Sequence, residues 1–282
     1  MLKPREKRRE GGRKSLRNSF PAHLKNQRLK VLSISAVIPN IATLLALCSG
    51  MTAIRMAMLE KWELAVVALL VAAFLDGMDG RLARLLGSTS RFGAELDSFS
   101  DLISFGAAPA IVMYMKGLHK WGETGWCIVL FFTVCMTLRL ARFNTRSIEG
   151  DSPTWSQGFF TGVPAPAAGY LALMPIMIQQ FWSAPFFEAP LLYAIVMIVT
   201  GGLMVSRVPT FSLKKVKVPQ RLVLPIMLLA VLTASAVYSH PWLSLSMIGF
   251  VYLGLIPFSV RSFRRVKNEM TRLEQEESLK AV

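Results

Sequence analysis

Residues 76–101 read DGMDGRLARLLGSTSRFGAELDSFSD, and the stretch holds four aspartates, at positions 76, 79, 97 and 101. Asp76 and Asp79 stand three residues apart, and Asp97 and Asp101 stand four apart. Residues at these spacings share one face of an α-helix. The stretch therefore predicts two helices that each present a pair of carboxylates and can meet at one end, with the connection at 86–94 between them.

The sequence around this stretch is that of a membrane protein. Hydrophobic residues make up 53% of the 282 positions, and they occur in runs separated by basic residues. A helix needs about 20 apolar residues to cross the hydrocarbon layer. We expect an all-α transmembrane bundle of about eight spans, or six if the last pair is misread. The expected spans lie near 32–57, 62–85, 95–115, 125–143, 160–181, 190–206, 221–239 and 242–260.

The distribution of charge predicts the orientation in the membrane. The chain has 32 Lys and Arg against 17 Asp and Glu, and the connections near 182–189 and 240–241 contain no Lys or Arg. Cytoplasmic loops carry an excess of basic residues. We expect a basic arm at 1–30, a transmembrane domain at 31–260 and a polar tail at 261–282, with both termini and the aspartates on the cytoplasmic side of a bacterial-type inner membrane. Because the basic residues flank spans, no nucleic acid is expected as a partner.

The four aspartates predict a metal site. An acid at the centre of a membrane helix costs about 2.5–3.5 kcal/mol, and facing acids also repel each other. A bound cation offsets both effects, and hard carboxylate oxygens favour Mg²⁺ or Mn²⁺. Four carboxylates are enough to bridge two ions, which would clamp a diphosphate. Two alternatives are a cation transporter lined by aspartates and a purely structural network of helix ends.

Small and basic residues beside the aspartates predict a phosphate ligand. Gly80 lies in a stripe of small residues with Gly77 and Ala83, which permits close helix packing, and a homodimer, without demanding either. A glycine also lets a ligand approach the backbone. Arg84 lies just past Gly80 on the same helix and can bind a phosphate oxygen or anchor the helix at the interface.

The pattern Asp-x2-Asp-Gly-x2-Ala-Arg-x8-Gly-x3-Asp-x3-Asp resembles the signature of the CDP-alcohol phosphatidyltransferases, and every fixed position is met. The resemblance implies a helical membrane fold, a site for two metal ions, and transfer of a phosphoalcohol from a CDP-linked donor with release of CMP. It implies that Asp76, Asp79 and Asp97 are metal ligands. It also implies that Asp101 binds the second metal and is the catalytic proton acceptor.

The same resemblance implies a binding site for the CDP-lipid. By position, Gly80, Arg84 and Ser90 would contact this donor. Upstream, the segment PNIAT at 39–43 resembles the family element Asn-x2-Thr, so that Asn40 and Thr43 would lie against the cytidine diphosphate. Without the resemblance, Asn and Thr in a membrane helix indicate hydrogen bonds between helices.

Three further segments resemble the membrane-embedded phosphatidylserine synthases within this family: DSFSDLISFGAAPA at 97–110, LRLARFN at 138–144 and FTGVPAPAAG at 160–169. The chain departs at Phe99-Ser100, where serine synthases commonly carry Leu-Ala. The likeness implies CDP-diacylglycerol and L-serine as substrates. Arg139 and Arg142 would bind the acceptor, since arginine suits a carboxylate, and membrane anchoring is the alternative role. Glycerol 3-phosphate and inositol are the alternative acceptors.

Overall fold

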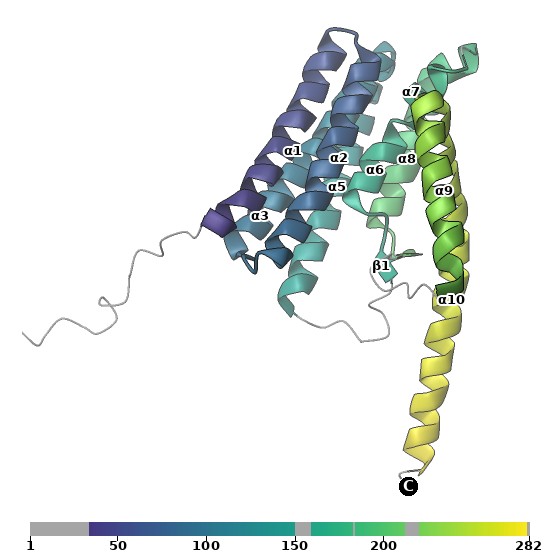
Figure 1. The fold of residues 1–282 in the computed structure, drawn as a ribbon. Coiled ribbons are helices and arrows are strands. Elements are labelled where there is room, and N and C mark those ends of the chain that lie inside the picture. The colour runs from purple at the N-terminus through teal and green to yellow at the C-terminus, as the bar shows by residue number, and fades with distance from the viewer. Residues whose placement is uncertain (1–33, 150–158, 183, 212–219, 281–282) are drawn as a thin grey trace, which may run out of the picture.

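The computed structural model describes residues 34–149, 159–182, 184–211 and 220–280, so the expected basic arm at 1–30 lies outside the described residues. Helices dominate the described part of the chain (Figure 1). The α-helices are α1 (Ile34–Met58), α2 (Trp62–Leu85), α3 (Arg91–Asp101), α4 (Ala108–Lys116), α5 (Glu123–Glu149), α6 (Ala165–Ala172), α7 (Met174–Gln179), α8 (Pro190–Val205), α9 (Gln220–Ser239) and α10 (Pro241–Lys280). Shorter elements are a π-helix η2 (Leu102–Ala107), 3₁₀ helices η3 (Leu118–Trp121) and η5 (Pro185–Glu188), and strands β1 (Phe159–Thr161) and β2 (Pro209–Phe211).

The prediction of an all-α membrane bundle is confirmed. Among the described residues, five helical stretches are long and apolar enough to cross a membrane: Val37–Met58, Arg91–Lys116, Glu123–Thr145, Gln220–Ser239 and Pro241–Arg265. α8 is apolar but shorter. α2 falls outside this set because any stretch of it long enough to cross contains Asp76 and Asp79 together with Glu63 or Arg81. The expected count of eight spans stays a prediction.

Small residues bring the first two helices close together. Ala53 and Ala57 of α1 and Ala65 of α2 are almost completely buried. The Ser49 hydroxyl of α1 donates a hydrogen bond of 2.7 Å to the Ala68 carbonyl of α2. Small side chains let membrane helices approach until such bonds form. This pair packs beside α4 and the core that α5, α6, α7 and α8 complete.

A short, well-defined connection joins α2 to α3. Gly87 has φ +58°, and Ser88 N–H donates to the Ala83 carbonyl while Gly87 N–H donates to the Arg84 carbonyl. This is a Schellman motif. It ends α2 at a position whose positive φ favours glycine. Ser90 then caps α3, because its hydroxyl accepts a hydrogen bond of 3.0 Å from Gly93 N–H. The chain turns back within a few residues, so both aspartate pairs lie at the same end of the bundle.

The helix that carries the second aspartate pair changes its winding directly after Asp101. Residues 102–107 form the π-helix η2, and π-helical turns are frequent at functional sites. Ser104 of η2 donates to the Ala46 carbonyl at 3.2 Å. A Cβ on Gly50 would lie only 2.6 Å from the Ser104 hydroxyl oxygen. The absence of a side chain at Gly50 therefore lets α1 and η2 touch just beyond the aspartates.

The C-terminal helices join the bundle through α10. The Tyr170 hydroxyl of α6 donates to the Leu245 carbonyl of α10. α9 has no buried residue, although the structure describes all of it. α10 runs without a break from Pro241 to Lys280, so the expected tail at 261–282 begins as a continuation of the last helix. This helix runs downward past the level of the α2–α3 connection and ends well below the rest of the bundle (Figure 1).

Candidate active site

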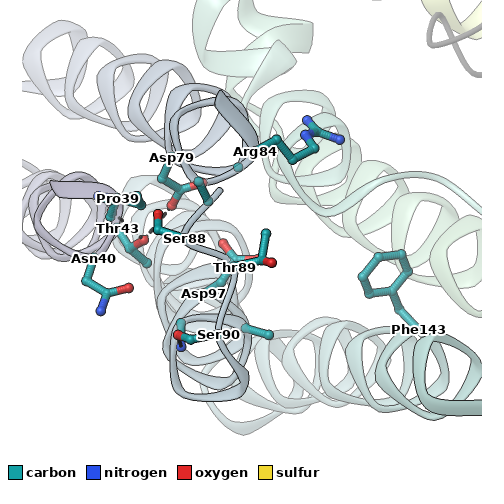
Figure 2. Close-up of a pocket in the computed structure, with 14 residues that line it drawn as sticks. Pro39, Asn40, Thr43, Asp79, Arg84, Ser88, Thr89, Ser90, Asp97 and Phe143 are labelled. Atoms are coloured by element: carbon teal, nitrogen blue, oxygen red, sulfur yellow. Dashed lines mark hydrogen bonds between the residues drawn. The ribbon is translucent and has the colours of Figure 1, made fainter. Parts of the chain in front are cut away.

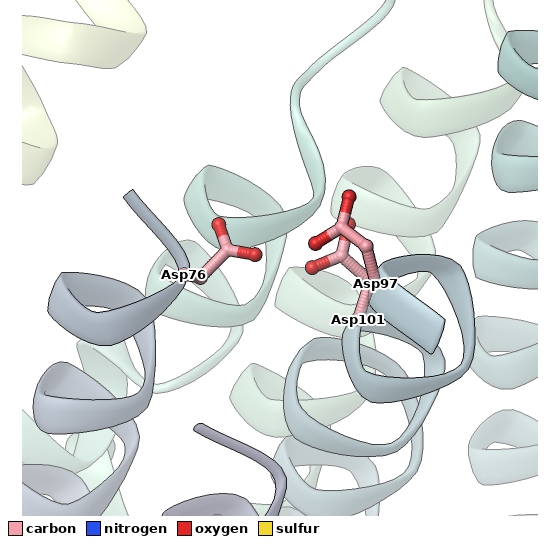
Figure 3. A group of neighbouring side chains, drawn as sticks. All are labelled: Asp76, Asp97 and Asp101. Carbon is pink, nitrogen blue, oxygen red and sulfur yellow. The ribbon is translucent and has the colours of Figure 1, made fainter. Parts of the chain in front are cut away.

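Three of the four aspartates form one cluster. Asp76 of α2 faces Asp97 and Asp101 of α3 across the gap between the two helices (Figure 3). One carboxylate oxygen from each lies within 4.8 Å of the other two. All three side chains are half-buried. The cluster therefore combines negative charge, partial burial and convergent oxygen ligands.

The donor atoms of this cluster suit a divalent metal ion. Asp101 Oδ1 is buried and has no hydrogen-bond partner among the described residues. A buried carboxylate oxygen without a partner is costly, and a cation satisfies it. Carboxylate oxygens are the ligands that hard divalent cations prefer. The Asp76, Asp97 and Asp101 cluster could therefore hold a metal ion.

Asp79 points to α1 and not into this cluster. The Thr43 hydroxyl donates a hydrogen bond of 2.6 Å to Asp79 Oδ2, and only 5% of the Asp79 residue surface is exposed. The Thr43 carbonyl in turn accepts a bond of 3.1 Å from the Ser100 hydroxyl of α3. Ser100 belongs to the Phe99-Ser100 pair, where the phosphatidylserine synthases commonly carry Leu-Ala. Thr43 thus links α1 to both aspartate-bearing helices.

A cavity of about 370 Å³, lined by both polar and apolar residues, lies beside the cluster (Figure 2). All five residues expected to contact the donor line this cavity, namely Asn40, Thr43, Gly80, Arg84 and Ser90. Asp79 and Asp97 also line it, so Asp97 belongs both to the aspartate cluster and to the cavity wall. Ser90 and Gly93 at the N-terminal end of α3 also line the cavity, and the N-terminus of a helix favours an anion.

The glycines of the small-residue stripe face open space. A Cβ added at Gly77 or Gly80 would meet no atom within 4 Å among the described residues. Close helix packing, one of the roles expected for the stripe, therefore does not occur at these two positions in the single chain. At Gly80, which lines the cavity, the missing side chain leaves the backbone accessible to a ligand.

The two arginines expected to bind the acceptor have different surroundings. Arg142 Nη1 donates a hydrogen bond of 2.8 Å to the Val205 carbonyl, which satisfies the C-terminal end of α8. Arg139 Nη1 is buried and has no hydrogen-bond partner among the described residues. Arg139 interacts electrostatically with Asp101 and Asp76. Of the pair, Arg139 therefore faces the aspartate cluster, and Arg142 ties α5 to α8.

Sequence reasoning missed several polar residues that position the site. Asn144 of α5 and Ser98 of α3 are hydrogen-bonded side chain to side chain, and the Asn144 Nδ2 to Ser98 Oγ distance is 3.0 Å. Ser100 and Ser104 attach α3 and η2 to α1. The available signal was the presence of Ser and Asn in otherwise apolar helices, where they tend to bond across helices.

Comparisons with known proteins point to one family. A family model described as CDP-alcohol phosphatidyltransferase matches residues 36–205, and a second, described as CDP-alcohol phosphatidyltransferase 2, matches residues 221–257. A protein of Mycobacterium tuberculosis is 37% identical over 235 residues, which are 81% of this chain and 79% of its own length.

Two more distant relatives are similar over most of their length. One from Helicobacter pylori is 31% identical and covers 77% of this chain and 88% of itself. One from Methanocaldococcus jannaschii is 30% identical and covers 81% of this chain and 96% of itself. All three relatives are named CDP-diacylglycerol–serine O-phosphatidyltransferase. From the matched family model, the length of these alignments and the aspartate site that they span, it follows that the chain belongs to the CDP-alcohol phosphatidyltransferase family.

Proposed function

We propose that this protein is a phosphatidylserine synthase, which transfers the phosphatidyl group of CDP-diacylglycerol to the hydroxyl of L-serine and releases CMP. The observation that carries the proposal is the junction at Asp97, where a cluster of carboxylates adjoins a cavity between α1, α2 and α3. Such a junction lets a diphosphate lie in the cavity with its reacting phosphorus at the aspartates. The names of the relatives support the choice of substrates.

The aspartates divide the metal-binding role in this proposal. Asp76, Asp97 and Asp101 would hold one Mg²⁺ or Mn²⁺ ion. Asp79 would help to hold a second ion while its carboxylate also accepts the hydrogen bond from Thr43. When bound, two such ions neutralise the diphosphate and stabilise charge on the attacking and leaving oxygens. Asn40, Gly80, Arg84 and Ser90 would bind the rest of the CDP group, as residues of the cavity wall.

The acceptor is activated by Asp101. The hydroxyl oxygen of serine attacks the β-phosphorus, the bond from this phosphorus to the oxygen of CMP breaks, and the hydroxyl proton passes to Asp101. A carboxylate has two oxygens, so Asp101 can give one to a metal ion and accept this proton on the other. CMP leaves with the bridging oxygen, and the lipid product stays in the membrane.

The acceptor site is proposed to contain Arg139. Its buried Nη1 is an unused donor beside the aspartates, and a guanidinium matches the carboxylate of serine. Inositol carries no anionic group for this arginine, which favours serine over inositol. Arg142 is left out of the acceptor site because its Nη1 is bonded to the Val205 carbonyl.

The protein is an integral membrane protein, and we propose a bacterial inner membrane with both termini and the active site on the cytoplasmic side. The basic residues near the aspartate end support this orientation, because positive charge is retained in the cytoplasm. The division into a basic arm at 1–30, a transmembrane domain at 31–260 and a tail at 261–282 belongs to the same proposal, as does a homodimer.

An acceptor panel tests the proposal. Purified protein is given CDP-diacylglycerol, Mg²⁺ or Mn²⁺, and either L-serine, glycerol 3-phosphate or inositol, and both CMP and the lipid product are measured. We expect equimolar CMP and phosphatidylserine with L-serine alone. CMP release with glycerol 3-phosphate but not with serine would overturn the choice of acceptor. If no acceptor gave a lipid product while vesicles containing the protein conducted cations, the transporter alternative would replace the enzyme.

A further inference from the structure

A second unused hydrogen-bond donor lies near Arg139, on a helix that the sequence motifs do not reach. The Tyr252 hydroxyl of α10 is buried and makes no hydrogen bond of ordinary length and angle with the described residues, although Thr210 of β2 lies close enough to interact with it. Tyr252 and Arg139 interact electrostatically, and Arg139 interacts in the same way with Asp101 and Asp76. A phenol O–H and a guanidinium N–H are therefore each buried without an ordinary hydrogen bond, within electrostatic range of each other, and the guanidinium is also within electrostatic range of the aspartate cluster.

The contacts of α10 hold Tyr252 in this place. The Tyr170 hydroxyl donates to the Leu245 carbonyl two turns before Tyr252 on the same helix. Thr210 of β2 lies close to the Tyr252 hydroxyl, but its own hydroxyl donates to the Gly162 carbonyl at 2.9 Å. Gly162 has φ +81°, and a Cβ there would lie 2.6 Å from the Met204 carbonyl oxygen. The surroundings of Tyr252 are thus fixed by bonds that do not use its hydroxyl.

Two buried donors without partners predict an anionic ligand. A buried donor is costly when it is left unpaired, and more so when it is charged. A carboxylate offers two oxygens, one for the guanidinium and one for the phenol, and so satisfies both donors. An uncharged alcohol would leave the charge of Arg139 without a counter-ion once metal ions neutralise the aspartates.

We infer that Tyr252 and Arg139 together bind the α-carboxylate of the acceptor amino acid, so that α10 forms one wall of the acceptor site. This inference rests on the proposed function, since it names the partner of the same site. The second family model matches residues 221–257, which include Tyr252. The inference gives this segment a role in the reaction. Tyr252 binds the carboxylate of the acceptor and so orients the acceptor hydroxyl toward Asp101. Tyr252 itself takes no part in proton transfer.

The variant Tyr252→Phe tests the inference because it removes the hydroxyl and keeps the ring. Tyr193→Phe is the matched control. The Tyr193 hydroxyl is also buried and without a partner among the described residues, but Tyr193 packs on Gly117, at the far end of the bundle from the aspartates. We expect Tyr252→Phe to raise the KM for L-serine roughly 10- to 100-fold, because the variant loses a hydrogen bond to a charged group. The KM for CDP-diacylglycerol should stay unchanged, and Tyr193→Phe should change neither constant.

A second acceptor separates recognition of the carboxylate from general damage to the fold. Ethanolamine lacks the carboxylate of serine, so the wild type should strongly prefer serine, and Tyr252→Phe should lower the ratio of the two rates. A rise in the KM for CDP-diacylglycerol instead would place the anion site on the donor phosphates and overturn the inference. An unchanged serine KM, or an equal change in Tyr193→Phe, would also overturn it. If the wild type makes no phosphatidylserine, the proposed function fails first.

Discussion

The helices around the aspartates and the helix α9 are built in opposite ways. Around the aspartates, hydroxyl groups bond from one helix to another, as Thr43 does to Asp79, Ser100 to Thr43 and Ser104 to Ala46. In α9, no residue is buried, and Thr233 donates to the Leu229 carbonyl of its own helix. Polar bonds across helices fix relative positions, whereas an apolar surface alone lets a helix slide in lipid. The difference shows where the protein needs precise geometry.

α10 stands between these two extremes. Its outer side chains are exposed, while the Leu245 carbonyl accepts a hydrogen bond from Tyr170 of α6 and Tyr252 interacts electrostatically with Arg139 of α5. One face of α10 thus belongs to the site and the other to the lipid. This division predicts that a substitution on the face toward the site changes activity more than one on the exposed face.

The largest expected effect comes from the aspartate cluster. Asp97→Asn keeps the size of the side chain but removes a charged ligand shared by the cluster and the cavity. We expect the rate of phosphatidylserine formation to fall on the order of 10³-fold, since metal stabilisation of the transition state is worth several kcal/mol.

The matched control for this substitution is Glu95→Gln, which removes an exposed carboxylate from the same helix. It should leave the rate within about twofold, because an exposed charge contributes little. Equal losses in both variants would mean that net charge on α3, and not the cluster, supports activity.

An intermediate effect is expected where α1 touches η2. In Gly50→Ala the new Cβ would lie 2.8 Å from Ser104 Cα, so the two helices must separate. We expect a loss of about 1–3 kcal/mol in stability, seen as a lower Tm, together with reduced activity. Gly254→Ala on α10 meets no atom within 4 Å and should raise stability by up to about 1 kcal/mol. If Gly50→Ala were as well tolerated as Gly254→Ala, the close contact between Gly50 of α1 and Ser104 of η2 would be contradicted.

The smallest effect is expected on α9. Leu228 is 61% exposed, so Leu228→Ala should change the stability in detergent by less than about 0.5 kcal/mol. Leu118→Ala is the comparison, since Leu118 is completely buried in η3 and its truncation should cost about 2–5 kcal/mol. Thermal unfolding of both variants measures this difference. A large loss for Leu228→Ala would indicate that α9 is covered by another chain, as a homodimer would require.

Much of the site could be predicted from the sequence, because spacing on a helix determines which side chains share a face. The pairs at 76/79 and 97/101 placed the aspartates on two helices that meet, and the apolar runs located most of the helices to within a few residues. The expected span at 160–181 instead begins with strand β1 and is divided into α6 and α7, and the last helix continues past 260 to Lys280. The π-helix at 102–107 was not predictable, since its residues are as apolar as those of an ordinary helix. The turn of Asp79 toward Thr43 depends on how α1 packs, which local spacing does not specify.

Two other features depend on contacts between distant parts of the chain. β1 and β2 pair antiparallel, with Phe160 opposite Thr210, yet each strand has three residues and shows no alternating pattern. Tyr252 lies far from the signature in sequence, in an apolar run that gave no sign of chemistry. Its position near Arg139 arises only when α10 packs against the bundle. Sequence patterns thus predicted the aspartate cluster better than the surroundings of Arg139.

The central claim is that the aspartate cluster performs metal-dependent transfer to serine, and one measurement tests it most directly. Purified protein is stripped with EDTA and given CDP-diacylglycerol and L-serine, and phosphatidylserine and CMP are followed as Mg²⁺ or Mn²⁺ is added back. We predict no product without metal, full recovery on addition, and no recovery in Asp97→Asn at the same metal concentrations. Phosphatidylserine formation that continued in EDTA, or that Asp97→Asn retained, would contradict this account.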